Sequence, residues 1–282
     1  RRLVSRSPRS STLLRGYRIL TGVRSSPPEL QFPTAITIDP VYTSGRQGRL
    51  SRLRMYETSE GRKLPSVTTI LSKSNPRRDL LENWKMRQTA LLGEEGFKQQ
   101  QQETLTSGTI VHSLIQHYLT PPPDQRVAPV LEDEYTERVQ RLWESVRPVL
   151  DDITEVDVIE SAVHHATLEY AGTIDCIATY KGEKRIIDWK TSRRKKYRLQ
   201  DTFDNPLQLA AYLGALYTDD RYPATARPES GMIVVIYEDE PASTFAVTKE
   251  ELEGYWKEWL KRYTDFQHVL QHGSLPTNPL SS

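Results

Sequence analysis

The chain has 282 residues, 37% hydrophobic and 27% charged, which is the composition of an ordinary globular protein with a substantial core. No apolar run approaches the roughly 18 residues that a membrane-spanning helix needs, so no membrane span and no membrane partner are expected. Cys176 is the only cysteine, which excludes an intrachain disulfide, a zinc site built from several thiolates and an iron–sulfur cluster. Any metal must therefore bind oxygen and imidazole ligands, a choice that favours Mg²⁺ or Mn²⁺.

Positive charge is concentrated in the first part of the chain. Residues 1–28 contain seven of the 38 Lys and Arg residues, many serines, and no Asp or Glu. This composition is typical of a mitochondrial transit peptide, and a disordered basic tail is the alternative interpretation. The remaining chain has 31 Lys and Arg against 37 Asp and Glu, a net charge of −6. If such an acidic domain binds nucleic acid, its basic groups must line a local groove.

The first half of the chain is predicted to be mainly helical. Residues 29–63 are polar with several Pro and Gly, which indicates irregular structure or short edge strands. Ser66 or Thr68 could cap a short helix that opens the ordered part. Apolar periodicity then predicts helices over 79–93, 107–119 and 132–150, and the polar run 99–102 is an exposed helix face or a mobile connection.

The second half changes to strands. Three β-rich runs are predicted to form antiparallel strands, and a helix, a strand and a long amphipathic helix follow them. The strands are expected over 156–165, 171–180, 184–191 and 231–238, and the helices over 207–217 and 250–271. We therefore expect an α/β fold, with a mixed sheet flanked by helices and helical additions ahead of it. A single domain is expected over 64–272, followed by a disordered tail over 273–282.

The strand sequence Ile187-Asp188-Trp189-Lys190 places a carboxylate and an ammonium on one face, because side chains alternate along a strand. Asp175 lies on the preceding strand, and the short turn 181–183 folds the two strands together. In a suitable register Asp175 and Asp188 lie side by side, and a divalent cation relieves their repulsion. With Lys190 beside them, the group could hydrolyse a phosphodiester; the alternative is an exposed cross-strand salt bridge.

Two residues outside this hairpin are further candidates. Glu160, on the first strand of the same sheet, is a plausible additional acid. His112 lies at the edge of an apolar helical stripe, where a histidine is more often structural than a ligand. It becomes a credible metal ligand because Gly108 permits another segment to approach closely and because its helix precedes the sheet.

The segment after the Asp188 strand has candidate substrate contacts. Gln208 and Tyr212 lie one turn apart on the next helix, where packing and substrate contact are equally weighted interpretations. A basic run that includes Arg193 and Arg194 directly follows the strand. Such runs are often only solvated loops, but this one lies where a nucleic-acid strand would leave the site.

At these residues the sequence resembles the RecB-like branch of the PD-(D/E)XK nucleases. That branch has a helical G-x-x-x-H, a strand Glu, G-x-x-D, D-x-K and then Q-x-x-x-Y. This chain supplies each in order, as Gly108 and His112, Glu160, Gly172 and Asp175, Asp188 and Lys190, and Gln208 and Tyr212. Any one of these elements is weak, but five in order are specific.

The resemblance implies a PD-(D/E)XK restriction-endonuclease-like core whose nuclease domain covers 64–272. It implies that His112, Asp175 and Asp188 bind Mg²⁺ or Mn²⁺ with help from Glu160, and that Asp175, Asp188 and Lys190 are catalytic. Gln208 and Tyr212 would hold the nucleic-acid backbone, joined by Arg193 and Arg194.

Further stretches, such as residues 187–192 and 202–208, are similar to mitochondrial exonucleases of this superfamily. They imply hydrolysis of single-stranded DNA at ends or flaps during mitochondrial genome replication and maintenance, with mitochondrial replication proteins as partners and a location in the matrix. The alternatives are an endonuclease or double-strand-dependent exonuclease of the same superfamily, or an inactive nucleic-acid-binding scaffold.

Overall fold

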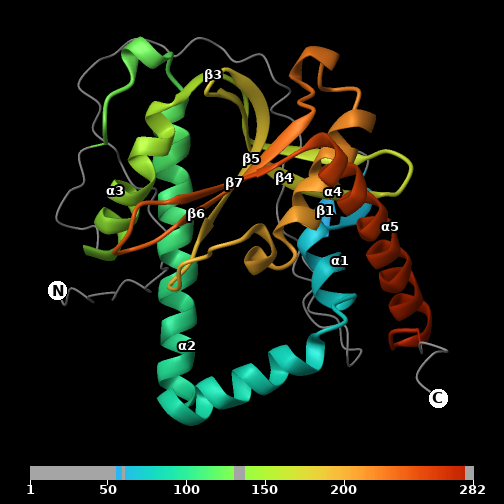
Figure 1. Cartoon of the computed structure of the whole chain (residues 1–282). Helices are drawn as coiled ribbons and strands as arrows, with labels where there is room; N and C mark the ends of the chain where they lie inside the picture. Colours follow the sequence, from blue (N-terminus) through green and yellow to red (C-terminus); the bar gives the residue numbers. More distant parts are fainter. Residues whose placement is uncertain (1–54, 59–60, 130–136, 277–282) are drawn as a thin grey trace, which may run out of the picture.

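The computed structural model describes residues 55–58, 61–129 and 137–276, and its centre is a five-stranded mixed sheet. The strands β3 to β7 lie in chain order across the sheet; β5 and β6 are parallel and the other neighbours are antiparallel. Their bounds are Ile153–His165 for β3, Tyr170–Tyr180 for β4, Glu183–Thr191 for β5, Ser230–Ile236 for β6 and Ser243–Val247 for β7. The expected mixed sheet flanked by helices is confirmed (Figure 1).

The three strands that carry the predicted carboxylates form a meander with tight turns. Lys181 and Gly182 join β4 to β5, and both have positive φ, 50° and 81°, as a type I′ hairpin turn requires. Glu169, with φ 53°, ends the turn between β3 and β4. The turns therefore set the register in which the three strands present their side chains.

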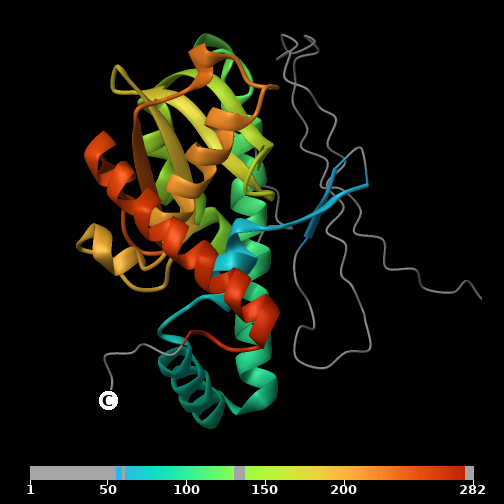
Figure 2. The same cartoon turned by 90° about the vertical axis from the view of Figure 1, so that its right-hand side faces the viewer.

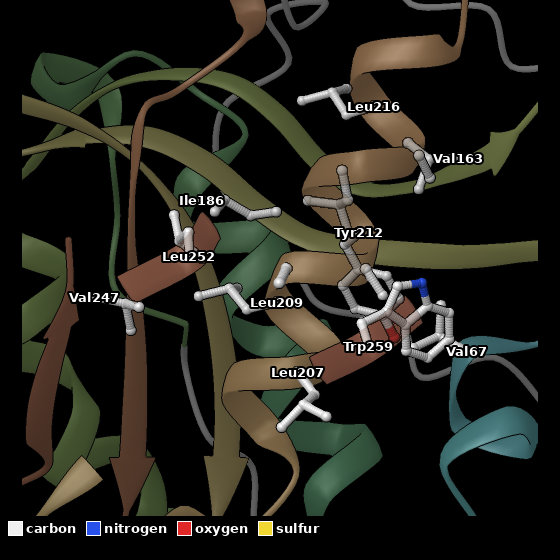
Figure 3. Close-up of a cluster of buried hydrophobic side chains, with 14 of the residues drawn as sticks. Val67, Val163, Ile186, Leu207, Leu209, Tyr212, Leu216, Val247, Leu252 and Trp259 are labelled. Carbon is white, nitrogen blue, oxygen red and sulfur yellow. The ribbon is translucent and has the colours of Figure 1, made fainter. Parts of the chain in front are cut away.

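One face of the sheet is covered by α1 (Val67–Lys73), α4 (Asn205–Thr218) and α5 (Lys249–His272). Ser66 caps α1 by accepting a hydrogen bond from the Thr69 amide, as one of the two predicted caps. Figure 3 shows the core on this face, where side chains of α4 lie against α5 and the sheet. The labelled side chains are Val67, Val163, Ile186, Leu207, Leu209, Tyr212, Leu216, Val247, Leu252 and Trp259.

The other face is covered by α3 (Glu137–Asp151) and the second half of α2 (Arg78–Leu119). Ile187 and Trp189 of β5 point into this second core, as the alternation predicted, while Ile186 belongs to the first core. The two cores lie on opposite faces of the sheet, so Asp188 and Lys190 project toward the α4 side.

The helix predicted over 79–93 is confirmed as the first part of α2, which consists of two helices joined by a kink at Gly93; the second helix begins directly after the kink and not at the predicted residue 107. Gly93 has φ 74° and ψ 163°, a conformation that few residues other than glycine adopt, and the polar run after it is an exposed helix face. Figures 1 and 2 show the first half of α2 as an arm below the sheet. Its predicted apolar positions, Leu80, Leu81, Trp84, Leu91 and Leu92, are all exposed.

Two further findings concern strands. β7 was not predicted. Short edge strands were one expectation for residues 29–63, and β1 (Met55–Glu57) and β2 (Lys63–Pro65) form a small separate sheet that packs through Tyr56 and Leu64 on Ala171. The expectations for 1–28, for 29–54 and for most of the final tail lie outside the described residues, as does the predicted helical part 132–136. Among the described helices, none is both long and apolar enough to span a bilayer.

Candidate active site

Three acidic residues stand opposite one another on three neighbouring strands. Cys176 pairs with Ile187, so the next residues along each strand, Asp175 of β4 and Asp188 of β5, face each other. Ile159 pairs with Cys176 and Ser161 with Ile174, which places Glu160 of β3 opposite Asp175. Glu160, Asp175 and Asp188 therefore form a row across the sheet, which we call the acidic row.

The backbone ladder between β4 and β5 ends at this row. Its last pair is Cys176 with Ile187, and beyond it the Trp189 amide donates to Asp175 Oδ2 at 2.9 Å. The Trp189 carbonyl lies 3.1 Å from His112 Nε2, which donates to it. The main-chain amide and carbonyl of Trp189 thus orient Asp175 and His112, two of the predicted metal ligands.

His112 reaches the acidic row from α2. Its Nδ1 lies 3.0 Å from Glu160 Oε1 and 3.8 Å from Asp175 Oδ2. One potential ligand atom from each of these three residues lies within 4.8 Å of the others. Because Nε2 is engaged by the Trp189 carbonyl, Nδ1 is the nitrogen left to face a cation, an arrangement common for metal-binding histidines.

Asp188 and Lys190 form a close ion pair beside this group. Lys190 Nζ lies 2.8 Å from Asp188 Oδ1 and 2.7 Å from Oδ2. Asp188 is 1% exposed, and its Oδ2 makes no aligned hydrogen bond among the described residues despite the nearby ammonium. A buried carboxylate oxygen without a donor is costly in a protein interior and is suited to bind a cation.

Burial and mutual repulsion raise the pKa values of the Asp175 and Asp188 carboxyls. Burial raises the pKa of Asp188 to about 6, with the charge of Asp175 adding to the effect and Lys190 opposing it. Burial also raises the pKa of Asp175, against the opposing charges of Lys190 and His112. Such raised carboxyl pKa values are typical of functional sites.

The two basic groups respond to the acids around them. Burial alone would lower the pKa of His112, but its hydrogen bond to Glu160 and the charges of Asp175 and Glu160 raise it to about 8. Burial likewise acts to lower the pKa of Lys190, and the charges of Asp188 and Asp175 outweigh it and raise the pKa. Without a cation, His112 and Lys190 therefore carry the positive charge that the acidic row needs.

The donor set fits Mg²⁺ or Mn²⁺, because it consists of carboxylate oxygens and one imidazole. Beside it lies the buried Oδ2 atom of Asp188, which accepts no aligned hydrogen bond among the described residues. His112, Glu160 and Asp175 form the tight group, whereas Asp188 is held by Lys190 at its edge.

Residues 83–280 match the family model of the PD-(D/E)XK nuclease superfamily, which covers more than half of the chain. The chain belongs to this superfamily. It is 38% identical over 208 residues to mitochondrial genome maintenance exonuclease 1 of Homo sapiens, covering 72% of this chain and 58% of that protein. The proteins of the same name from Mus musculus and Xenopus tropicalis are 35% and 37% identical over 216 and 207 residues. These matches cover 76% and 72% of this chain, and 62% and 57% of those relatives.

In this PD-(D/E)XK chain Glu160 adopts a strained backbone. Its φ is 41°, within a strand, where a residue other than glycine is expected to be extended. Ser161 Oγ bridges across it to the Ile159 carbonyl at 2.7 Å, and Tyr222 donates to the Ala162 carbonyl at 2.6 Å. Neighbouring contacts hold a conformation that costs about 1–3 kcal/mol, as is common at functional sites.

Gln208 and Tyr212 are the pair for which packing and substrate contact were the two interpretations. Both are buried, and Gln208 Nε2 donates to the Tyr212 hydroxyl at 2.6 Å. The Tyr212 ring packs on Gly172, where an added Cβ would lie 2.3 Å from Tyr212 Cε1. Gly172 of the G-x-x-D motif thus makes room for the tyrosine of the Q-x-x-x-Y motif. Their contact with a nucleic-acid backbone stays a prediction.

Gly108 has a smaller steric role than expected. A Cβ at this position would meet Thr191 Oγ1 at 3.7 Å, an ordinary van der Waals contact. The close approach that was the reason for favouring His112 therefore does not require glycine here. His112 is placed instead by its contacts with Glu160 and Trp189.

Arg193 and Arg194 lie exposed directly after β5 and form no ion pair within the part of the chain that the structure describes. Sequence patterns did not reveal the orienting role of the Trp189 peptide, because main-chain groups leave no signature in residue identity. Nor did they reveal the hydrogen bond from the Tyr222 hydroxyl to the Ala162 carbonyl of β3, which joins residues 60 positions apart.

Proposed function

We propose that this chain is a divalent-metal-dependent exonuclease that hydrolyses phosphodiester bonds at the ends or flaps of single-stranded DNA in the mitochondrial matrix. The observation that carries the proposal is the acidic row across β3, β4 and β5, with His112 at one end and Lys190 at the other. Membership of the PD-(D/E)XK superfamily supports the class of reaction.

In the proposed site, His112, Glu160, Asp175 and Asp188 would hold Mg²⁺ or Mn²⁺. When bound, the cation polarises a phosphate oxygen and makes a water molecule more acidic. The raised pKa of Lys190 keeps its ammonium charged at neutral pH, where it can stabilise negative charge that develops on the phosphate. The Trp189 peptide keeps His112 and Asp175 oriented throughout.

The proposed substrate and compartment are inferred from the relatives and from the composition of residues 1–28. The relatives are named as exonucleases of mitochondrial genome maintenance, and this chain spans about three fifths of their length. The Arg-rich, acid-free composition of residues 1–28 is consistent with import into mitochondria. A role in processing DNA ends beside mitochondrial replication proteins is part of the proposal and goes beyond the relatives' names.

The proposal is tested by incubating the purified full chain with 5′- and 3′-labelled oligonucleotides, single- and double-stranded, and with closed single-stranded circles, in Mg²⁺ or EDTA. We expect metal-dependent release of nucleotides from linear single strands and intact circles. Rapid nicking of circles would favour an endonuclease, and preferred degradation of duplexes a double-strand-dependent exonuclease. No cleavage in any metal would leave only the inactive scaffold.

The same assay with variants links activity to the site. Lys190→Ala and Asp188→Ala should each reduce cleavage at least about 100-fold while the folded structure is retained, because Lys190 stabilises the reacting phosphate and Asp188 holds the cation. Lys249→Ala is the matched control, since Lys249 forms an exposed ion pair with Glu229 at the start of α5. Full cleavage by Lys190→Ala would overturn the assignment.

A further inference from the structure

Among the described residues, four residues other than glycine have positive φ: Glu160, Glu169, Lys181 and Phe203. Glu169 and Lys181 lie in the hairpin turns, and Glu160 lies in the acidic row. Phe203 belongs to none of these. Its φ of 58° and ψ of −119° match the first central position of a type II′ turn, which is dominated by glycine.

Packing of the Phe203 side chain does not offset the energy cost of this backbone conformation. It is 69% exposed, so little of its apolar surface is removed from water in the folded chain. The residue on each side is held in place, since Thr202 Oγ1 donates to the Leu199 carbonyl and Asp204 binds Arg262. The fold thus holds a bulky aromatic residue outward at a position that glycine would fill at lower cost.

The surroundings of Phe203 are aromatic and basic. The Nζ atom of Lys196 lies 4.9 Å from the centre of the Phe203 ring, and Tyr197, the residue after Lys196, is 78% exposed. Arg193, Arg194 and Lys196 form no ion pair within the described ranges, so their charges are available to a polyanion. Exposed aromatic rings interleaved with free cations are the combination that binds single-stranded nucleic acid.

The segment is continuous with the candidate active site at both ends. The segment, residues 193–203, begins just after the end of β5. Arg193 is three residues from Lys190 in the chain, so their Cα atoms lie within about 11 Å of each other. The other end of the segment leads into α4, which carries Gln208 and Tyr212. Figure 1 shows this segment in amber, between the end of β5 and the start of α4.

We propose that Phe203 and Tyr197 form a stacking platform for unpaired nucleobases beside the acidic row, with Arg193, Arg194 and Lys196 binding the adjoining phosphates. A duplex buries the faces of its bases, so the platform selects single strands. This inference rests on the proposed function for the identity of the polymer and adds the residues that give it its strand preference.

The decisive variant is Phe203→Gly, because the inference predicts opposite effects on folding and binding. Glycine removes the strain at positive φ, so the full chain should unfold at a higher temperature. Loss of the ring should weaken binding of a labelled single-stranded oligothymidine about 5- to 100-fold in EDTA, where the strand is not cleaved. The measurements are thermal unfolding and fluorescence anisotropy.

An abasic strand of the same length shows whether the bases are the partner. Wild-type protein should bind it more weakly than oligothymidine, and Phe203→Gly should bind the two about equally. Phe203→Tyr keeps a ring and should retain the preference. Tyr217→Ala is the matched control, because Tyr217 is also exposed with a cation, Arg227, 5.4 Å from its ring centre.

Wild-type affinity in Phe203→Gly, for a strand that the wild-type chain cleaves, would overturn the platform and leave the proposed function standing. A lower unfolding temperature in Phe203→Gly would show that the ring serves the fold instead, and would also overturn it. If the wild-type chain neither binds nor cleaves any strand, the proposed function fails together with the platform.

Discussion

Asp188 is a costly side chain in the cation-free protein. It is almost completely buried, its pKa is raised to about 6, and one of its oxygens has no aligned donor among the described residues. Lys190 compensates for only part of the cost, because burial and the charge of Asp175 still outweigh the ammonium. The residue is therefore suited to binding a cation and poorly suited to stabilising the fold without one.

We expect Asp188→Asn to abolish cleavage and to stabilise the cation-free protein at pH 8. A carboxyl whose pKa is raised from 3.8 to about 6 on folding stabilises the protein most below pH 4, and this contribution is lost as the pH rises through 6. Asparagine is neutral throughout, so relative to wild type the variant should be more stable at pH 8 in EDTA than at pH 4, with part of the gain offset by the loss of the ion pair with Lys190.

Urea unfolding at the two pH values measures this difference. Asp239→Asn, at an exposed carboxylate paired with Arg141, serves as the control and should change stability little at either pH. Addition of Mg²⁺ should reverse the order, because the cation stabilises only the chain that retains the carboxylate. A variant less stable than wild type at pH 8 in EDTA would contradict the account of Asp188.

The individual site residues differ in how far sequence reasoning could place them. The tight turn after Tyr180 fixes the β4–β5 register, so the pairing of Asp175 with Asp188 could be predicted. The position of Glu160 was less certain, because register shifts interrupt the start of the β3–β4 ladder and its own φ is positive. Periodicity placed His112 at the edge of a stripe but gave no information on its contact across the sheet.

At the level of elements, the strands β3 to β6 and the helices α4 and α5 were predicted more closely than the bounds of α2. Alternating and continuous apolar runs marked β3 to β6 to within a few residues, whereas β7 has partly exposed positions and only five residues. The first helix of α2 ends at the kink at Gly93, as predicted, whereas the second starts well before residue 107 because the polar run 99–102 is an exposed helix face. The apolar side chains of the arm are largely exposed among the described residues, although the Trp84 ring packs edge-on against Phe97.

The packing of α4 on β4 yields a prediction for Gly172→Ala. The added methyl would overlap the Tyr212 ring, whose Cε1 atom would lie 2.3 Å away, so the ring or the strand must move. We expect a loss of about 1–3 kcal/mol in unfolding free energy and a reduction in cleavage, because Asp175 lies three residues along the same strand.

Gly108→Ala provides the comparison within the same motif set. Its Cβ would make only an ordinary contact with Thr191, and alanine favours a helix over glycine by about 1 kcal/mol. Chemical denaturation should show Gly108→Ala as stable as wild type or more stable. Equal effects of the two substitutions would mean that the contact of Gly172 with Tyr212 does not determine the packing.

On the scale of the whole molecule, the charge is unfavourable for binding a polyanion. Beyond residue 28 the chain has a net charge of −6, while Arg193 and Arg194 lie exposed directly after the strand that carries Asp188 and Lys190. Binding of a single strand should therefore depend on few phosphate contacts and fall moderately with salt.

We expect the double variant Arg193→Ala/Arg194→Ala to reduce the slope of log K against log[salt] by about 1.4, since each lost phosphate contact to a single strand changes it by about 0.7. Anisotropy titrations between 50 and 200 mM KCl measure the slope. Arg78→Ala/Arg141→Ala, which removes two arginines held in exposed ion pairs, is the control. An unchanged slope would exclude both arginines from phosphate contact.

The hydrogen bonds of the Trp189 peptide have a consequence for how the site tolerates mutation. Asp175 and His112 are oriented by an amide and a carbonyl that every amino acid except proline supplies in full. Replacement of the indole would disturb the core beneath it, yet both orienting contacts would remain chemically available. The orientation of two proposed cation-binding side chains thus depends on the path of the backbone and not on the side chain at position 189. Substitutions at this position should therefore disturb the packing of the core before they disturb that orientation.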